Sequence, residues 1–441
     1  MMSQINEKQI AEWNQKEHGD FVLKGHVCFS KSKDEISITE NGYIVSVNGI
    51  SQGVFTELPE EYRSFPLHDF GDQLIVPGMS DLHVHAPQYT YRGLGMDMEL
   101  LDWLKTHTFP EESKYASLDY AERAYTIFAD DLKHSATTRA VVFATMHAPA
   151  TELLMDKLEA AGLCSYVGKV NMDRNSTETL TEASAEEALR VTEKWIEDTR
   201  DRYQNTRPIL TPRFTPSCTD ALMRGLGDLR KKYHLPVQSH LSENQSEIAW
   251  VKELCPWSSS YGDTYDQPGL LDEADGTIMA HCVYTDGEEL ALLKERGVYI
   301  AHCPQSNINL ASGIAPVKKF LELGMHVGLG TDVAGGSSLS MFRAIQDAVA
   351  VSKLRWRIMD QSRKPLTTEE GFYLATLGGG AFFGKVGSFL AGYEMDALVL
   401  DNSAIRTTKE RSIKDALEQY IYLAQEGGRI SAKFVKGRRI F

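Results

Sequence analysis

Two histidines separated by one residue, His83 and His85, are the first feature of the sequence that suggests chemistry. They end an apolar run, LIVPGMSDLHVH, whose composition is typical of a buried β-strand. Alternate residues of a strand point to the same face, so both imidazoles can face one site. Two imidazoles so placed often belong to a metal centre. The alternative interpretation is a pair of core histidines with satisfied hydrogen bonds.

Three more candidate ligands end other strand-like runs. His240 ends PVQSH, His281 ends TIMAH and Asp332 ends GLGTD. In a barrel of parallel strands the carboxyl ends meet at one mouth, where barrel enzymes have their active sites. Neutral imidazoles and one carboxylate suit Zn²⁺ or Fe²⁺ with an open position for water. The set therefore predicts a metal site that activates water for hydrolysis.

Glu243 follows His240 by three residues, in SHLSEN. A carboxyl group at this position would face water at the metal and can move a proton between that water and a substrate atom. The alternative is a glutamate that stabilises the start of a helix through the helix dipole. Beside a metal site, we predict the acid–base role.

Arg213 and Phe214 end the run LTPRF at the same predicted mouth. A guanidinium group donates parallel hydrogen bonds to a flat ring, and a phenyl ring can stack on that ring. Arginine here also argues against a second metal held by a carboxylated lysine, for which Lys169 in VGKVN is the remaining candidate. His147 and His302 end strands as well, and they either line the pocket or pack in the core.

The elements that must position these residues recur from about residue 74 onward. Short apolar runs alternate with amphipathic segments such as LDYAERAYTIFADDLKHS and EEALRVTEKWIEDTRDRY, which is typical of βαβ units. The segment after the first run contains Trp103, which suits a core position better than a ligand contact, although the segment can cap the mouth. Eight runs favour a closed (β/α)8 TIM barrel: LIVPGMSDLHVHA, TRAVVFATMH, CSYVGKVNMD, RPILTPRF, LPVQSHLSE, GTIMAHCVY, GVYIAHCPQSN and MHVGLGTDVAGG.

Both ends of the chain have a different pattern. Residues 21–77 alternate in twos and contain Asn-Gly turns, which is typical of β-hairpins. SFLAGYEMDALVLD and KFVKGRRIF, near the carboxyl end, also have strand character. We therefore predict an α/β protein in which a barrel over residues 77–387 lies beside a small β-sandwich domain formed by residues 1–76 and 388–441.

The composition excludes several classes of protein. The 441 residues include 46 Lys and Arg against 61 Asp and Glu, which gives a net charge of −15 and no basic block. A nucleic-acid partner is therefore not expected. No run reaches the length of a membrane span, and the polar N-terminus lacks the pattern of a signal peptide. The six scattered cysteines are typical of reduced, mostly buried thiols in a cytoplasmic protein.

Several motifs together resemble the amidohydrolase superfamily, and the likeness covers nearly the whole chain: PGMSDLHVHAPQY, TPRFTPSC, QSHLSEN, MAHCVY, AHCPQSN and GLGTDVAGG. The resemblance implies a barrel with a small β domain, a homodimer, and one Zn²⁺ per chain, with Fe²⁺ as the alternative. It implies that the catalytic residues are Glu243, Asp332 and His281. The metal ligands that it implies are His83, His85, His240 and Asp332. The substrate-binding residues that it implies are Gln88, Arg213, Phe214, His240, Glu243 and Asp332.

The motifs are closest to the purine-deaminating members, which implies hydrolysis of guanine to xanthine and ammonia in purine catabolism or salvage. Glu243 would then protonate N3 of the ring, Asp332 would take a proton from water, and His281 would steady the new oxygen. Arg213 would donate to O6 and thereby disfavour adenine, which has an amino group there. The alternatives are a related enzyme for 8-oxoguanine or a triazine, and a barrel scaffold without activity.

Overall fold

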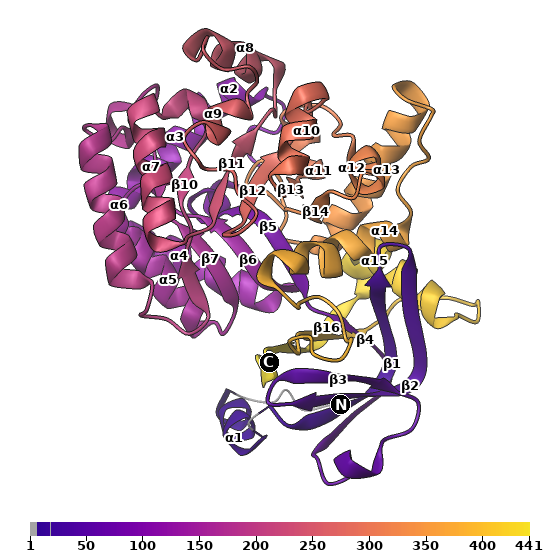
Figure 1. Cartoon of the computed structure of the whole chain (residues 1–441). Coiled ribbons are helices and arrows are strands. Elements are labelled where there is room, and N and C mark those ends of the chain that lie inside the picture. The colour runs from indigo at the N-terminus through magenta and orange to yellow at the C-terminus, as the bar shows by residue number, and fades with distance from the viewer. Residues whose placement is uncertain (1–6, 18) are drawn as a thin grey trace.

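The structure is a computed structural model that describes residues 7–17 and 19–441. Figure 1 shows a barrel surrounded by helices, and beside it a sheet built from the two ends of the chain. The first six residues, on which the signal-peptide prediction partly rests, lie outside the described residues. None of the described helices combines the length and the hydropathy that a membrane crossing needs.

Parallel strands form the barrel, and each of the eight predicted runs supplies one position in it. Two ladders of four strands are joined by the short pair β8–β10 and by a bridge between Leu210 and Val237. The third and fourth positions are each divided into two short strands. The strands are β5 (Met79–His85), β6 (Thr137–Phe143), β7 (Cys164–Gly168), β8 (Val170–Asn171), β9 (Thr206–Pro208), β10 (Thr211–Pro212), β11 (Val237–Leu241), β12 (Thr277–His281), β13 (Tyr299–His302) and β14 (His326–Leu329).

The barrel closes between its last and first strands. The backbone N–H of Asp332 donates to the carbonyl of His83 at 2.8 Å, and that of His85 donates to the carbonyl of Val333 at 3.0 Å. These two bonds join the segment after β14 to β5. Closure therefore places three of the predicted functional residues next to one another.

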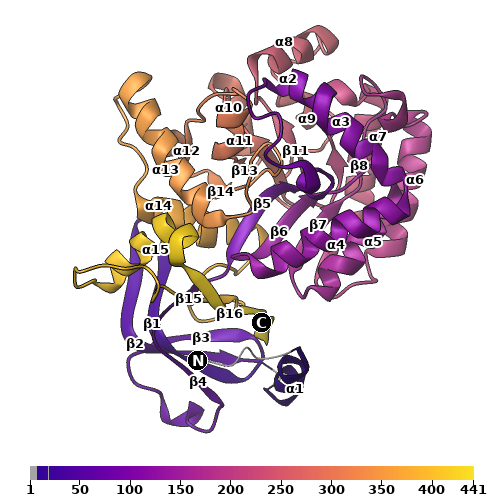
Figure 2. The same ribbon diagram turned by 180° about the vertical axis from the view of Figure 1, so that it is seen from behind.

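Helices cover the outside of the barrel, and Figures 1 and 2 both show α4 to α7 around β6 and β7. In α4, which the sequence predicted, Ala121, Tyr125, Phe128 and Leu132 form one buried stripe, and the side chain of Ser117 caps the first turn. The helices are α1 (Glu7–Glu17), α2 (Leu100–Trp103), α3 (Phe109–Glu112), α4 (Leu118–His134), α5 (Ala148–Ala160), α6 (Ala185–Thr199), α7 (Asp220–Tyr233), α8 (Gln245–Leu254), α9 (Asp263–Asp266), α10 (Gly287–Glu295), α11 (Pro304–Asn309), α12 (Val317–Glu322), α13 (Met341–Ile358), α14 (Thr368–Tyr373) and α15 (Ile413–Gly427).

The terminal strands form one mixed sheet of seven strands, in the order β17-β16-β15-β4-β1-β2-β3, in place of the two layers of a sandwich. The sheet is continuous because β4 pairs with β1 in parallel and with β15 antiparallel, and so joins the strands from both ends of the chain. Its strands are β1 (Phe21–Ser32), β2 (Glu35–Val47), β3 (Ile50–Phe55), β4 (Leu67–Pro77), β15 (Ala397–Asp401), β16 (Arg429–Val435) and β17 (Arg438–Arg439).

A single residue, Gly78, separates β4 of the sheet from β5 of the barrel. A Cβ atom at this position would lie 2.3 Å from the hydroxyl oxygen of Thr138, so only glycine fits the close approach of the two parts. The strand that contains the two neighbouring histidines is therefore a direct continuation of the terminal sheet.

Candidate metal centre and adjoining pocket

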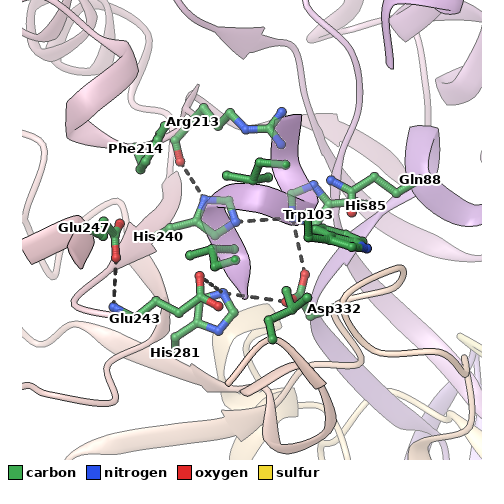
Figure 3. A pocket seen from close by; sticks show the side chains of 13 residues that line it. His85, Gln88, Trp103, Arg213, Phe214, His240, Glu243, Glu247, His281 and Asp332 are labelled. Atoms are coloured by element: carbon green, nitrogen blue, oxygen red, sulfur yellow. Dashed lines mark hydrogen bonds and ion pairs between the residues drawn. The ribbon is translucent and has the colours of Figure 1, made fainter. Parts of the chain in front are cut away.

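The side chains of His83, His85, His240 and Asp332 converge at the carboxyl end of the barrel strands. Figure 3 shows three of them, His85, His240 and Asp332. Nε2 of His85 lies 3.2 Å from Nε2 of His83 and 3.2 Å from Nε2 of His240. The Oδ1 atom of Asp332 lies 3.2 Å from Nε2 of His83 and 3.4 Å from Nε2 of His85. As predicted, the side chains of residues 83 and 85 point to the same face of β5.

These distances fit a metal ion. Atoms bound to zinc at about 2.0–2.1 Å in a tetrahedron lie roughly 3.3 Å from one another. Nδ1–H of His240 donates to the carbonyl of Arg213 at 2.6 Å, so the Nε2 atom of this ring presents a lone pair to the centre. A cation satisfies lone pairs that converge in this way. The group therefore has the geometry of a metal-binding site.

The protonation states of the four side chains also suit a metal. Burial lowers the pKa of His83. It lowers the pKa values of His85 and His240 further below their usual value, and the neighbouring His83 adds to the decrease in both. Burial alone would raise the pKa of Asp332, but the neighbouring histidines outweigh it and hold this pKa well below its usual range. Neutral imidazoles and an ionised carboxylate are the forms that bind metal.

Glu243 and His281 lie beside this centre (Figure 3). Nε2 of His281 is 3.4 Å from Oε2 of Glu243 and 3.7 Å from Oδ2 of Asp332. Nδ1–H of His281 donates to Oδ1 of Asn307 at 2.9 Å, and Ser312 donates its hydroxyl to Oε1 of Glu243 at 2.8 Å. Burial raises the pKa of Glu243 to about 7. This carboxyl group can therefore hold or release a proton near neutral pH.

The start of α8 holds Glu243 in place. Asn244 is the N-cap residue, and its side chain accepts from the N–H of Ser246. The carboxylate of Glu247 accepts from the N–H groups of both Glu243 and Asn244, at 3.1 and 3.3 Å. Glu247 thus has the helix-start role that was the alternative for Glu243, and the side chain of Glu243 is free to face His281.

A pocket opens next to the centre, and the sequence-predicted recognition residues Gln88, Arg213 and Phe214 all line it (Figure 3). Arg213 and Phe214 directly follow β10, and Gln88 lies just after β5. Trp103 also lines the pocket, so the segment after β5 caps the mouth while its tryptophan is buried. The other lining residues are His85, Leu100, Leu104, His240, Glu243, Glu247, His281, Leu310 and Asp332.

Other residues singled out in the sequence lie outside the pocket lining. His302 is buried, its Nδ1 has no hydrogen-bond partner, and burial lowers its pKa to about 3. His147 is half-buried and also lines no part of the pocket. Lys169 pairs with Glu182 at 2.6 Å, which favours an ion-pair role for this side chain. All six cysteines are free and buried, as predicted.

Sequence reasoning missed four polar residues around the site. Asn307, Ser312 and Glu247 support the groups described above, and the carboxylate of Glu112 bonds to both Arg213 and Gln88. Cys303 was also missed as a neighbour of the centre, because its Sγ atom lies within 4.8 Å of ligand atoms of the metal group. None of the four polar residues lies at the end of a barrel strand: three lie in helices and Ser312 lies in a loop, so the strand pattern carries no signal for them. Of the four, only Glu247 has a local signal, the Asn244-x-x-Glu247 spacing of a capping box.

Comparisons with known proteins agree with this geometry. Residues 74–440 match the model of the amidohydrolase family. A guanine deaminase of Mus musculus is 39% identical over 436 residues, which are 95% of this chain and 92% of that protein. A guanine deaminase of Escherichia coli is 33% identical over 87% of this chain and 86% of its own. The crystal structure of guanine deaminase from C. acetobutylicum, with guanine bound in its active site, is 45% identical with a TM-score of 0.92, covering 96% of this chain and all of that one.

Proposed function

This chain belongs to the amidohydrolase family, and from that premise we propose that it hydrolyses guanine to xanthine and ammonia. The chain is a hydrolase of the guanine-deaminating type, like its relatives of 33% and 39% identity. The observation that carries the proposal is one pocket that joins a buried metal-binding group to two hydrogen-bond donors and an aromatic ring. Guanine is the substrate that this combination fits.

We infer that His83, His85, His240 and Asp332 hold one Zn²⁺ per chain, with Fe²⁺ as the alternative. The support for this assignment is the spacing of their ligand atoms, 3.2–3.4 Å. Such an ion supplies one kind of chemistry: it lowers the pKa of water toward about 7, so that a nucleophile is available at neutral pH.

The chain's own residues would move the protons. Oδ2 of Asp332 lies 3.7 Å from Nε2 of His281 and would accept the proton that water loses as its oxygen bonds to C2. Glu243 would donate a proton to N3, which makes C2 a better electrophile. His281 would hold the new oxygen. Asp332 would then pass its proton to the amino group, so that the C2–N bond breaks and ammonia leaves. The hydroxyl at C2 would return a proton to Glu243 as it becomes the carbonyl of xanthine.

We assign recognition of the purine to three residues that line the pocket: Arg213, Gln88 and Phe214. Arg213 would donate to O6, and Gln88 would add a second hydrogen bond to the ring edge. Phe214 would contact the face of the ring. Adenine would place an amino donor opposite the guanidinium group, and the unpaired buried donors would cost about 1–3 kcal/mol each, which disfavours adenine.

A paired measurement on the purified protein tests the proposal. We expect one zinc per chain by elemental analysis, and loss of guanine absorbance with equal release of ammonia. His240→Ala is the matched control, because it keeps the recognition residues and removes one ligand; it should lose both metal and turnover. Metal without guanine turnover would instead point to another ring, such as 8-oxoguanine or a triazine. Absence of both would support a scaffold. The homodimer and the cytoplasmic location stay predictions.

A further inference from the structure

A carboxylate outside the pocket lining, that of Glu112, joins two of the three predicted recognition residues, Arg213 and Gln88. Oε2 of Glu112 accepts from Nη1 of Arg213 at 2.5 Å, and its Oε1 accepts from Nε2 of Gln88 at 2.9 Å. All three side chains are buried, with at most 4% of each residue exposed. One carboxylate thus holds the two donors that face the pocket.

The contacts of Glu112 determine which atoms the neighbours present. The Oε1 atom of Gln88 accepts from the N–H of Ala334 at 3.2 Å, and its Nε2 atom donates to Glu112. These two hydrogen bonds together fix the orientation of the side-chain amide. The guanidinium carbon of Arg213 also lies 5.5 Å from the centre of the Phe109 ring. The short helix α3, Phe109–Glu112, therefore contacts Arg213 twice. The ring of Phe109 faces the guanidinium group, and the carboxylate of Glu112 bonds to its Nη1 atom.

The same segment forms the cap of the pocket. Between α2 and α3 lies one π-helical turn, Leu104–Thr108, and π turns are frequent at functional sites. Leu100, Trp103 and Leu104, from the first part of this segment, line the pocket. The cap and the carboxylate that orients the donors are thus parts of one continuous piece of chain.

We propose that Glu112 is a positioning residue that sets the preference of the pocket for a purine with an oxo group at C6. It balances the buried charge of Arg213 and keeps N–H groups of Arg213 and Gln88 directed at an acceptor. A ring without the 6-oxo group gains little from this arrangement. The inference rests on the proposed function, because it takes the ligand to be a 6-oxopurine.

Calorimetric binding of two rings tests the inference without relying on turnover. Xanthine has the 6-oxo group, and 2-aminopurine lacks it. Glu112→Gln offers one acceptor and one donor in place of two acceptors, so at most one of the two contacts remains. We expect its Kd for xanthine to rise about tenfold, the effect of one charge-assisted hydrogen bond, and its Kd for 2-aminopurine to change less than about threefold.

Glu111→Gln is the matched control, because Glu111 is the neighbouring buried carboxylate on the same helix. It accepts from Thr90, Lys114 and Tyr120 and contacts neither recognition residue. We expect both Kd values to stay within about threefold of the parent protein, since its partners lie outside the pocket. Zinc content should be unchanged in both variants, because neither residue belongs to the metal group.

The double variant Glu112→Gln/Arg213→Gln shows whether Glu112 acts through Arg213. In the Arg213→Gln background, the further change should add little to the loss of xanthine binding. Equal weakening of both rings in Glu112→Gln, equal effects in Glu111→Gln, or xanthine binding by none of the proteins would overturn the inference. Guanine turnover of the parent protein is measured separately. Its absence would contradict the proposed function, while selective loss of xanthine binding would still support the role of Glu112.

Discussion

Burial and neighbouring charges shift the pKa values of two residues at this site, Glu243 and His281. Glu243 and His281 are both buried, and they face each other across 3.4 Å. Burial alone would lower the pKa of His281, but the carboxylates of Glu243 and Asp332 outweigh it and raise this pKa. A carboxyl group with a raised pKa and an imidazole that readily takes a charge form a pair of groups that can exchange protons with a substrate.

The pH dependence of turnover follows from Glu243. Its pKa is raised from 4.5 to about 7 by burial, so the group carries a proton below pH 7 and loses it above. Because the proposed role is donation to N3, kcat/KM for guanine should be level below about pH 6 and fall about tenfold per pH unit well above pH 7. Initial rates between pH 5.5 and 9 measure this. A rate that rises through pH 7 would show that Glu243 acts first as a base.

The variant Glu243→Gln tests proton donation separately from metal binding. We expect kcat to fall by about 10²–10⁴, the usual contribution of a general acid, while zinc content stays at the level of the parent protein. Loss of metal in this variant would mean that Glu243 helps to hold the ion, and the acid role would then have no separate support.

Arg213→Ala should separate recognition from metal binding. The side chain donates to Glu112 and lines the pocket, whereas its backbone carbonyl contacts His240, a proposed metal ligand. We therefore expect kcat/KM for guanine to fall by about 10²-fold or more, since a buried charged partner is lost, with zinc content unchanged. Elemental analysis beside steady-state kinetics measures both. A proportional loss of zinc would contradict the assignment.

The residues that sequence reasoning found lie at or just after strand ends, and most of those that it missed lie in helices or loops where no pattern marks them. His83, His240 and Asp332 each end an apolar run, and the end of a strand in a barrel is by itself a position at the mouth. Glu112 lies in FPEE, where nothing distinguishes it from Glu111. The difference between the two appears only when α3 packs against Arg213.

At the scale of elements, the barrel was predictable because each strand has its own apolar run and parallel strands follow one another around the barrel. The terminal sheet was harder to predict from the sequence. The hairpin turn at Asn48 and Gly49, both with positive φ, has a sequence signature. The parallel pairing of β4 with β1 has none, because it joins segments separated by two other strands. The two ends of the chain form one sheet because strands that are distant in the sequence pair with each other.

Removal of a helix cap tests whether α8 positions the acid. Asn244→Ala removes the side chain that caps α8 directly after Glu243. We expect a loss of about 1 kcal/mol in unfolding free energy, as for other N-cap residues, together with a lower kcat. Ser412→Ala is the matched control: Ser412 caps α15 with the same capping-box geometry but contacts no pocket residue. It should cost similar stability and leave kcat unchanged. Equal kinetic effects in both variants would contradict the role of α8.

At the scale of the whole molecule, buried polar contacts join the barrel to the terminal sheet. Arg139 of β6 donates to both carboxylate oxygens of Asp396, at 2.5 and 2.8 Å, and to Glu394 at 2.8 Å. The ammonium group of Lys433, in β16, donates to the carbonyls of Leu132, Lys133 and Ser135 at the end of α4. Arg139 lies opposite Ser80 in the pairing of β6 with β5, so these contacts join the two parts near the start of the strand that ends in the proposed metal ligands.

The pair of Arg139 and Asp396 gives the strongest test of this connection. Asp396→Asn leaves a buried guanidinium group without its main counter-charge, and such a loss costs about 3–5 kcal/mol of stability. Asp401→Asn, in the same sheet, removes the partner of Arg429, which is 73% exposed; this change should cost at most about 1 kcal/mol. Urea unfolding measures both.

Neither residue lines the pocket, so kcat under native conditions should stay unchanged in both variants. If the two variants lost equal stability, the buried pair would not be what joins the sheet to the barrel. If only Asp396→Asn lost zinc while folded, the connection would reach the metal centre through β5.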